Sequence, residues 1–188
     1  MNLRFGIAGT LLALLIGCGG GSSNSTFSGT IRGRQLRPAD AISGSGSYRI
    51  SSTQSINVAV VVLSSASGLC GNASAGRQPK NSQFFVITLS DRTGSQTAIP
   101  TAPGSYTVNS TTKFAGVGYL ETDATCQTPM ALQATANSGT VVLTSVTNGL
   151  SGSFDVTLDT GDHVTGSFNA PNCGGLLGFL NLASPTCI

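Results

Sequence analysis

The stretch that decides the fold is Thr140–Asn169, TVVLTSVTNGLSGSFDVTLDTGDHVTGSFN. In its central part, SFDVTL (153–158), polar and apolar residues alternate strictly, which predicts a strand with one solvated face and one buried face. Asn148-Gly149 is a strong hairpin signal, and Asp159–Asp162 is a second turn. We therefore expect a three-stranded antiparallel meander over Thr140–Val146, Leu150–Leu158 and His163–Asn169.

Similar patterns continue through the rest of the body. Val58–Leu63 is a near-continuous β-branched run, which predicts a strand buried on both faces. Further strands are expected over Phe27–Leu36, Tyr48–Ser51, Ile56–Leu63, Gln83–Ser90, Ser105–Val108 and Phe114–Glu121. Short strands between frequent turn signals favour an all-β fold. We expect a single antiparallel β-sandwich domain over residues 26–188, with the meander at its C-terminal end.

The segments between these strands are expected to be irregular. Ser64–Ser82 is predicted to be a long polar loop, and Gly44–Ser47 (GSGS) a flexible loop tip. Pro129–Asn137 is the best helix candidate, because no segment of the body sustains a 3.6-residue apolar period.

The N-terminal eighteen residues have a different character. Arg4 precedes an apolar run over Ile7–Ile16, which is shorter than the roughly 20 residues that span a bilayer and has the layout of a secretory signal. The run ends in Leu15-Ile16-Gly17-Cys18, which resembles the lipobox of bacterial lipoproteins. The resemblance covers only about the first 25 residues.

That resemblance implies a signal peptide over residues 1–17, removed by cleavage between Gly17 and Cys18. Cys18 would carry a diacylglyceryl group, and its new amine a further acyl chain such as palmitate. Two or three such chains make membrane attachment effectively permanent. Gly19 stands where some lipoproteins carry an inner-membrane retention Asp, which favours the outer membrane, on its periplasmic face or at the cell surface. Residues 18–25 would then be the lipidated cysteine and a flexible Gly/Ser linker.

Four further cysteines would remain once Cys18 is lipidated: Cys70, Cys126, Cys173 and Cys187. An even number in an exported chain predicts two disulfides. Of the three possible pairings we favour Cys70–Cys126 and Cys173–Cys187. A zinc site is the weaker interpretation, because the chain has no CxxC pair and a single histidine.

Composition narrows the choice of partners. Charged residues make up 9% of the chain and its net charge is +2, which gives no general attraction to nucleic acid. The low charge also argues against a charge-rich disordered protein. No cofactor is expected, because no phosphate-binding glycine motif occurs: Gly116–Gly118 lies in a strand pattern without a following helix.

His163 is the main candidate for chemistry. It follows the turn over Asp159–Asp162, and Asp155 is also near in sequence. As a general base His163 would need partners, and no G-x-S-x-G motif supplies a serine nucleophile. A Ca²⁺ site at Asp159 and Asp162 is a minor alternative, since the turn lacks an EF-hand's ligand set. We expect an exposed hairpin end, with no catalytic or metal-binding residue.

Three arginines lie close together in the sequence, at Arg32, Arg34 and Arg37. Arg32 and Arg34 would share a strand face, where they would either bind acidic sugars or lipid headgroups or, as we favour, form a solvated face that discourages edge pairing. The chain has no Trp and three Tyr, so no stacking platform for sugars or bases is evident.

These observations favour a non-enzymatic, membrane-anchored envelope lipoprotein with a structural, interaction or ligand-binding role. The body's Gly152-Ser153-Phe154 and Gly166-Ser167-Phe168 repeats and late cysteines are loosely similar to small lipoproteins of Gram-negative bacteria, a similarity that carries no functional residues. One alternative is an accessory lipoprotein of a secretion or outer-membrane assembly machine, docking an envelope protein through an exposed strand or loop. A less favoured alternative is an envelope hydrolase centred on His163.

Overall fold

Strands dominate the computed structural model, which describes residues 24–51 and 54–188. The expected signal peptide and Cys18 lie outside the described residues. The strands are β1 Thr26–Ser28, β2 Asp40–Arg49, β3 Ser55–Ser64, β4 Arg77–Gln78, β5 Gln83–Thr93, β6 Gln96–Ala98, β7 Gly104–Val108, β8 Lys113–Glu121, β9 Gln133–Ser145, β10 Gly149–Leu158, β11 His163–Pro171 and β12 Thr186–Cys187. The helices are α1 Leu69–Ser74, α2 Leu176–Leu180 and the 3₁₀ turn η1 Met130–Leu132.

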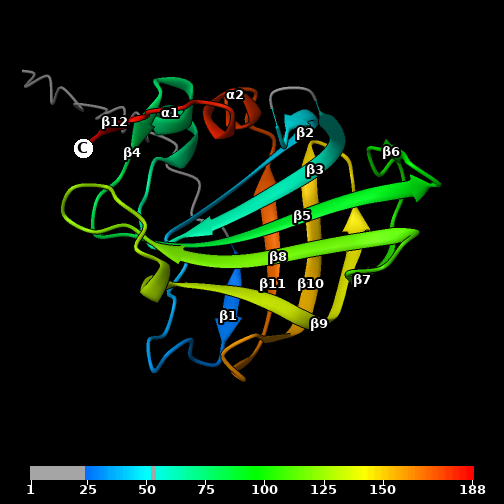
Figure 1. Ribbon diagram of the computed structural model, residues 1–188, viewed down its shortest axis with the longest axis horizontal. Helices are drawn as coiled ribbons and strands as arrows, with labels where there is room; N and C mark the ends of the chain where they lie inside the picture. The colour runs from blue at the N-terminus through cyan, green and yellow to red at the C-terminus, as the bar shows by residue number, and fades with distance from the viewer. Residues whose placement is uncertain (1–23, 52–53) are drawn as a thin grey trace, which may run out of the picture.

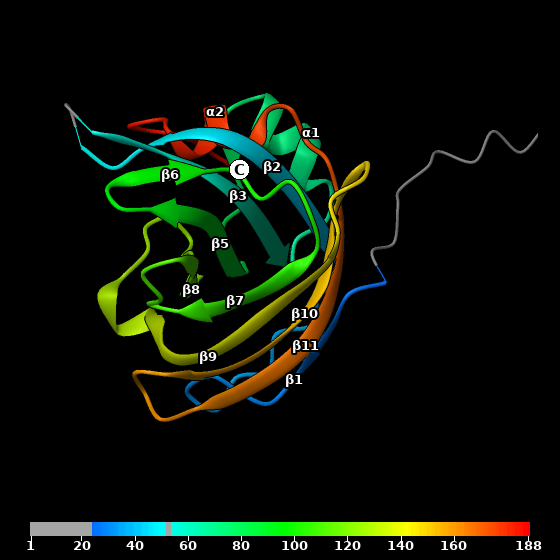
Figure 2. The same cartoon turned by 90° about the vertical axis from the view of Figure 1, so that its right-hand side faces the viewer.

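Ten strands form one curled sheet in the order β1-β11-β10-β9-β7-β8-β5-β3-β2, with β6 added beside β5 (Figures 1 and 2). The pairing of β7 with β8 is parallel, so the sheet is mixed, and its other strand pairs are antiparallel. The curl brings β2 beside the end of β11, where the Ser43 hydroxyl donates to the Ala170 carbonyl at 2.7 Å. The all-β class is therefore confirmed, and the two halves of the sheet face each other across a shared core.

The C-terminal meander is also confirmed, as β9, β10 and β11. Its two Gly-Ser-Phe repeats fit together, because Gly152 lies opposite Phe168 and Phe154 lies opposite Gly166 in the register of β10 and β11. A Cβ on Gly166 would stand 2.5 Å from a ring carbon of Phe154. Each glycine thus makes room for the phenylalanine of the other repeat.

Strand β3 is buried on both faces, as its sequence predicts. Ala59, Val61 and Leu63 belong to the main core inside the curl, where Phe85 and Phe154 meet with ring centroids 4.8 Å apart. The alternate side chains of β3 pack on the outer face of the sheet, in a second apolar cluster under α1 and α2. This second cluster includes Val58, Val60, Val62, Phe84, Leu69 and Leu176.

The prediction of a strand over Phe27–Leu36 is wrong beyond Ser28, where β1 ends. Gly29 and Gly33 have φ angles of 99° and 76°, and Arg32 has a φ of 52°, so the chain turns sharply instead of extending. The turn is closed by paired backbone hydrogen bonds between Ile31 and Arg34.

The loop tip expected at Gly44–Ser47 is wrong as well, because these residues lie within the ten-residue strand β2. Gly44 and Gly46 are not there for flexibility. A Cβ on Gly46 would stand 2.8 Å from a methyl carbon of Leu177, and one on Gly44 would stand 3.3 Å from Leu176. Glycine at both positions leaves space for α2 to lie against the strand.

The helix expected over Pro129–Asn137 is wrong, since only η1 is helical there and β9 begins at Gln133. The loop expected over Ser64–Ser82 instead contains α1 and β4. Helices α1 and α2 are six and five residues long, too short to produce the periodic pattern on which sequence-based prediction depends.

Two disulfides are present, but the favoured pairing is wrong. The bonds join Cys70 to Cys173 and Cys126 to Cys187, across 103 and 61 residues of sequence. Closeness in sequence was misleading because the fold brings α1 beside the segment that precedes α2. It also brings the C-terminal strand β12 across to β4.

Candidate functional site

The candidate site is an apolar pocket on the outer face of the sheet, beneath α1 and α2. Asp40, at the start of β2, positions α1 by accepting hydrogen bonds through its two carboxylate oxygens. Its Oδ2 accepts from the Leu69 backbone N–H at 2.8 Å, and its Oδ1 accepts from the Ala41 backbone N–H at 2.8 Å. The carboxylate thereby satisfies a backbone donor that a helix start leaves without a partner.

The second wall of the pocket is α2, which is fixed against α1. The Cys70–Cys173 disulfide links α1 to the residue three positions before α2. Gly175 lies so close to α1 that an added Cβ would stand 2.7 Å from the Cα of Ser74. The two helices therefore form one covalently linked cover over the sheet.

The third wall is the small sheet of β4 and β12, which pair in parallel. The Cys126–Cys187 disulfide ties β12 to the loop between β8 and β9. The Ile188 backbone N–H donates to the Gln78 carbonyl, and the Lys80 N–H donates to the Ile188 carbonyl, both at 3.0 Å. Each disulfide thus holds a different side of the pocket in place.

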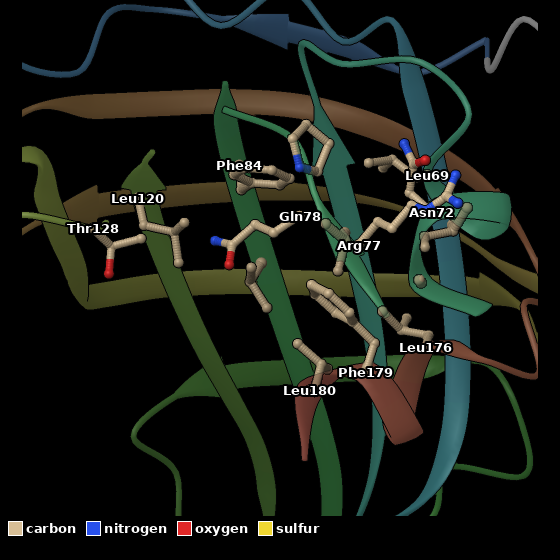
Figure 3. A pocket seen from close by; sticks show the side chains of 15 residues that line it. Leu69, Asn72, Arg77, Gln78, Phe84, Leu120, Thr128, Leu176, Phe179 and Leu180 are labelled. Atoms are coloured by element: carbon tan, nitrogen blue, oxygen red, sulfur yellow. The ribbon is translucent and has the colours of Figure 1, made fainter. Parts of the chain in front are cut away.

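The space between these walls has a volume of about 150 Å³, and its lining is overwhelmingly apolar (Figure 3). The side chains come from β2, β3, β5 and β8 below and from α1, α2 and the β4 segment around the rim. The apolar lining residues are Ile42, Val62, Leu69, Ala73, Pro79, Phe84, Val86, Leu120, Leu176, Phe179 and Leu180. The pocket is partly open to solvent, and its apolar lining is what makes it suitable for an apolar group.

Four polar residues complete the lining: Asn72, Arg77, Gln78 and Thr128. Figure 3 shows Arg77 reaching from β4 toward Asn72 of α1, while Gln78 points the other way, toward Leu120. Arg77 is exposed and forms no ion pair within the described part of the chain. The lining includes no Asp or Glu, so the pocket carries one positive charge at its edge.

His163 lies elsewhere, on β11 of the meander. Its Nε2 is 2.7 Å from Oδ1 of Asp155 on β10, and both side chains are more than half exposed. Asp155 is His163's only hydrogen-bonding side-chain partner among residues 24–51 and 54–188. His163 therefore lies at an exposed hairpin end, as the sequence predicts, where it forms a surface cross-strand pair with Asp155.

The two aspartates of the neighbouring turn, Asp159 and Asp162, accept hydrogen bonds from different residues. Asp159 accepts from the Thr135 backbone N–H at 3.1 Å. Asp162 accepts hydrogen bonds from the Thr160 hydroxyl at 2.6 Å and from the Arg32 backbone N–H at 2.9 Å. These two bonds, and the Thr160 bond most of all, hold the pKa of Asp162 below its usual value. Across the described residues, no three His, Cys, Asp or Glu side chains gather where they could hold a metal ion.

The arginines expected to share a strand face have separate roles. The Arg32 guanidinium donates to the Gln133 carbonyl at 3.1 Å, and Arg34 forms an ion pair with the buried Glu121. Glu121 also accepts from the Tyr119 hydroxyl at 2.5 Å. The pKa of Tyr119 is raised, mainly because burial disfavours the charged phenolate and also because of its hydrogen bond to Glu121. These contacts attach the turn after β1 to the end of β8.

No protein-family model, curated protein or solved structure matches this chain. Within residues 24–51 and 54–188, no helix has the length and apolar character needed to cross a membrane.

Sequence reasoning missed the pocket altogether. A usable signal was the apolar group LLGFL (176–180), which follows Cys173 after two glycines, in a tail that has no strand pattern. A second signal was the alternation of Gly44 and Gly46 with serines, because a strand that has no side chains on one face leaves room for a helix to pack there.

Proposed function

We propose that this protein is a non-enzymatic envelope lipoprotein, anchored to the outer membrane through Cys18, that binds a small apolar ligand in the pocket beneath α1 and α2. The observation that carries the binding role is the pocket of about 150 Å³, unfilled by the protein's own side chains and walled by helices that a disulfide links. Apolar cavities of about this volume bind benzene-sized molecules in other proteins. The lipobox supports the anchor.

The binding role is tested by photo-labelling. The purified full chain in zwitterionic nanodiscs is exposed to a diazirine-bearing octanol, and the labelled peptides are mapped by mass spectrometry. We expect labelling on α1, α2 or β5, displaced by unlabelled octanol. The Ala73→Leu variant, which fills the pocket, should label about tenfold less, because about two methylene contacts are lost at roughly 0.8 kcal/mol each. Labelling spread evenly over the surface, or unchanged in Ala73→Leu, would refute the proposal.

The anchor is tested by cell fractionation. The wild-type chain should be found with the outer membrane and incorporate labelled palmitate, whereas Cys18→Ser should incorporate none. A wild-type chain that takes up no palmitate would exclude lipidation.

A further inference from the structure

The edge of the pocket identifies the class of ligand more closely. We infer that the ligand is an amphipathic carboxylate of the fatty-acid type, with its chain in the pocket and its carboxylate bound by Arg77. This inference deepens the proposed function and depends on it. Three observations lead to it: the apolar lining, the position of Arg77 and the Asn72 amide toward which Arg77 reaches.

The lining suits a hydrocarbon chain because its floor offers only apolar side chains. Ile42, Val62 and Phe84 are each less than a tenth exposed and come from three adjacent strands. Leu176 of α2, which is 2% exposed, closes the opposite side. A hydroxyl or amine placed among these groups would lose its hydrogen bonds to water, so the polar end of a ligand must lie at the edge.

The edge supplies one cation and no acid. Arg77 lies on β4 and lines the pocket, and its guanidinium forms no ion pair with any residue that the structure describes. A guanidinium presents donors in a planar fork that matches a carboxylate. Arg77 reaches toward Asn72 of α1 (Figure 3), and within residues 24–51 and 54–188 the Asn72 side-chain amide forms no hydrogen bond with the protein. This amide remains available to a ligand's head group.

The pairing of β4 with β12 fixes Arg77 at the edge. Arg77 lies opposite Thr186 in the register, and the Cys126–Cys187 disulfide anchors the neighbouring position. Lys80 provides a matched comparison. It lies three residues further along the same segment and is also exposed, but it does not line the pocket.

The test compares two photoreactive ligands that differ only in the head group, octanoic acid and octanol carrying the same diazirine. Each is applied to the full chain in zwitterionic nanodiscs, as wild type, Arg77→Gln, Arg77→Lys and Lys80→Gln. We expect Arg77→Gln to weaken labelling of the pocket by the acid about threefold to fivefold, the range for a partly exposed ion pair. Octanol labelling should fall less than acid labelling in Arg77→Gln, because the alcohol carries no charge for Arg77 to pair with. Arg77→Lys should recover part of the loss, and Lys80→Gln should behave as wild type.

The outcomes separate this inference from the proposed function. If acid and alcohol label the wild-type pocket equally and Arg77→Gln alters neither, the carboxylate inference is overturned while the apolar ligand site stands. If Lys80→Gln weakens acid labelling as much as Arg77→Gln does, general surface charge is responsible and the inference is likewise overturned. If neither probe labels the pocket, both proposals fail.

Discussion

The Ala73→Leu substitution tests whether the pocket is open space. Ala73 lies on α1, lines the pocket and is 7% exposed. Leucine adds three carbon atoms, which at roughly 0.8 kcal/mol per buried methylene gives an upper limit of about 2.4 kcal/mol. Fixing the leucine side chain costs about 0.5–1 kcal/mol. We therefore expect a gain of about 1.5 kcal/mol in the free energy of unfolding.

At about 2–4 °C per kcal/mol for a domain of this size, that gain raises Tm by about 3–6 °C, measured by circular dichroism. The matched control is Ala115→Leu, the same substitution at a residue with no exposed surface in the main core. Overpacking there should cost about 1–3 kcal/mol. If Ala73→Leu lowered Tm as Ala115→Leu does, the pocket would not be open space. A stabilised Ala73→Leu protein that still labelled fully with octanol would show that the ligand binds elsewhere.

Three further predictions follow from the same contacts. Replacing Cys70 and Cys173 together by serine should lower the free energy of unfolding, measured by urea titration, by about 2–4 kcal/mol, and it should reduce octanol labelling. Full labelling in the double variant would show that this disulfide is not needed to hold the pocket walls in place. The folded state raises the pKa of Tyr119, so the contribution of this residue to the free energy of unfolding is fully present below about pH 10 and should fall by up to about 1.4 kcal/mol per pH unit above it. Urea titrations at rising pH should therefore show a smaller loss of stability in Tyr119→Phe than in the wild type. Equal losses in the two proteins would exclude Tyr119 as the source. Gly166→Ala should cost about 1–3 kcal/mol by the same measurement, since its Cβ would stand 2.3 Å from the Thr26 carbonyl oxygen, whereas Gly174→Ala meets nothing within 4 Å and should be nearly neutral.

The meander and β3 could be predicted because their signals are local. Strict alternation over Ser153–Leu158 and an Asn-Gly turn specify a hairpin without reference to the rest of the chain. The double burial of Val58–Leu63 is likewise a property of the run itself. The structure confirms both, and it confirms that all four body cysteines form disulfides.

The pocket could not be predicted because its walls depend on contacts between distant segments. Gly44 and Gly46 have the composition of a loop, and only the presence of α2 above them explains why glycine fits a strand there. Arg77 similarly lies in a segment whose composition predicts a polar loop, and it becomes part of the pocket's edge only because β4 pairs with β12, more than a hundred residues later. Local propensity contains no information about such contacts.

A crystal structure determined under xenon pressure shows directly whether the pocket is open apolar space, since xenon enters dry apolar cavities. We expect a xenon atom in the pocket, among Phe84, Leu120 and Leu176, and none in the Ala73→Leu variant. Ordered water in the pocket, or walls that have closed to leave no space, would contradict the proposed binding site.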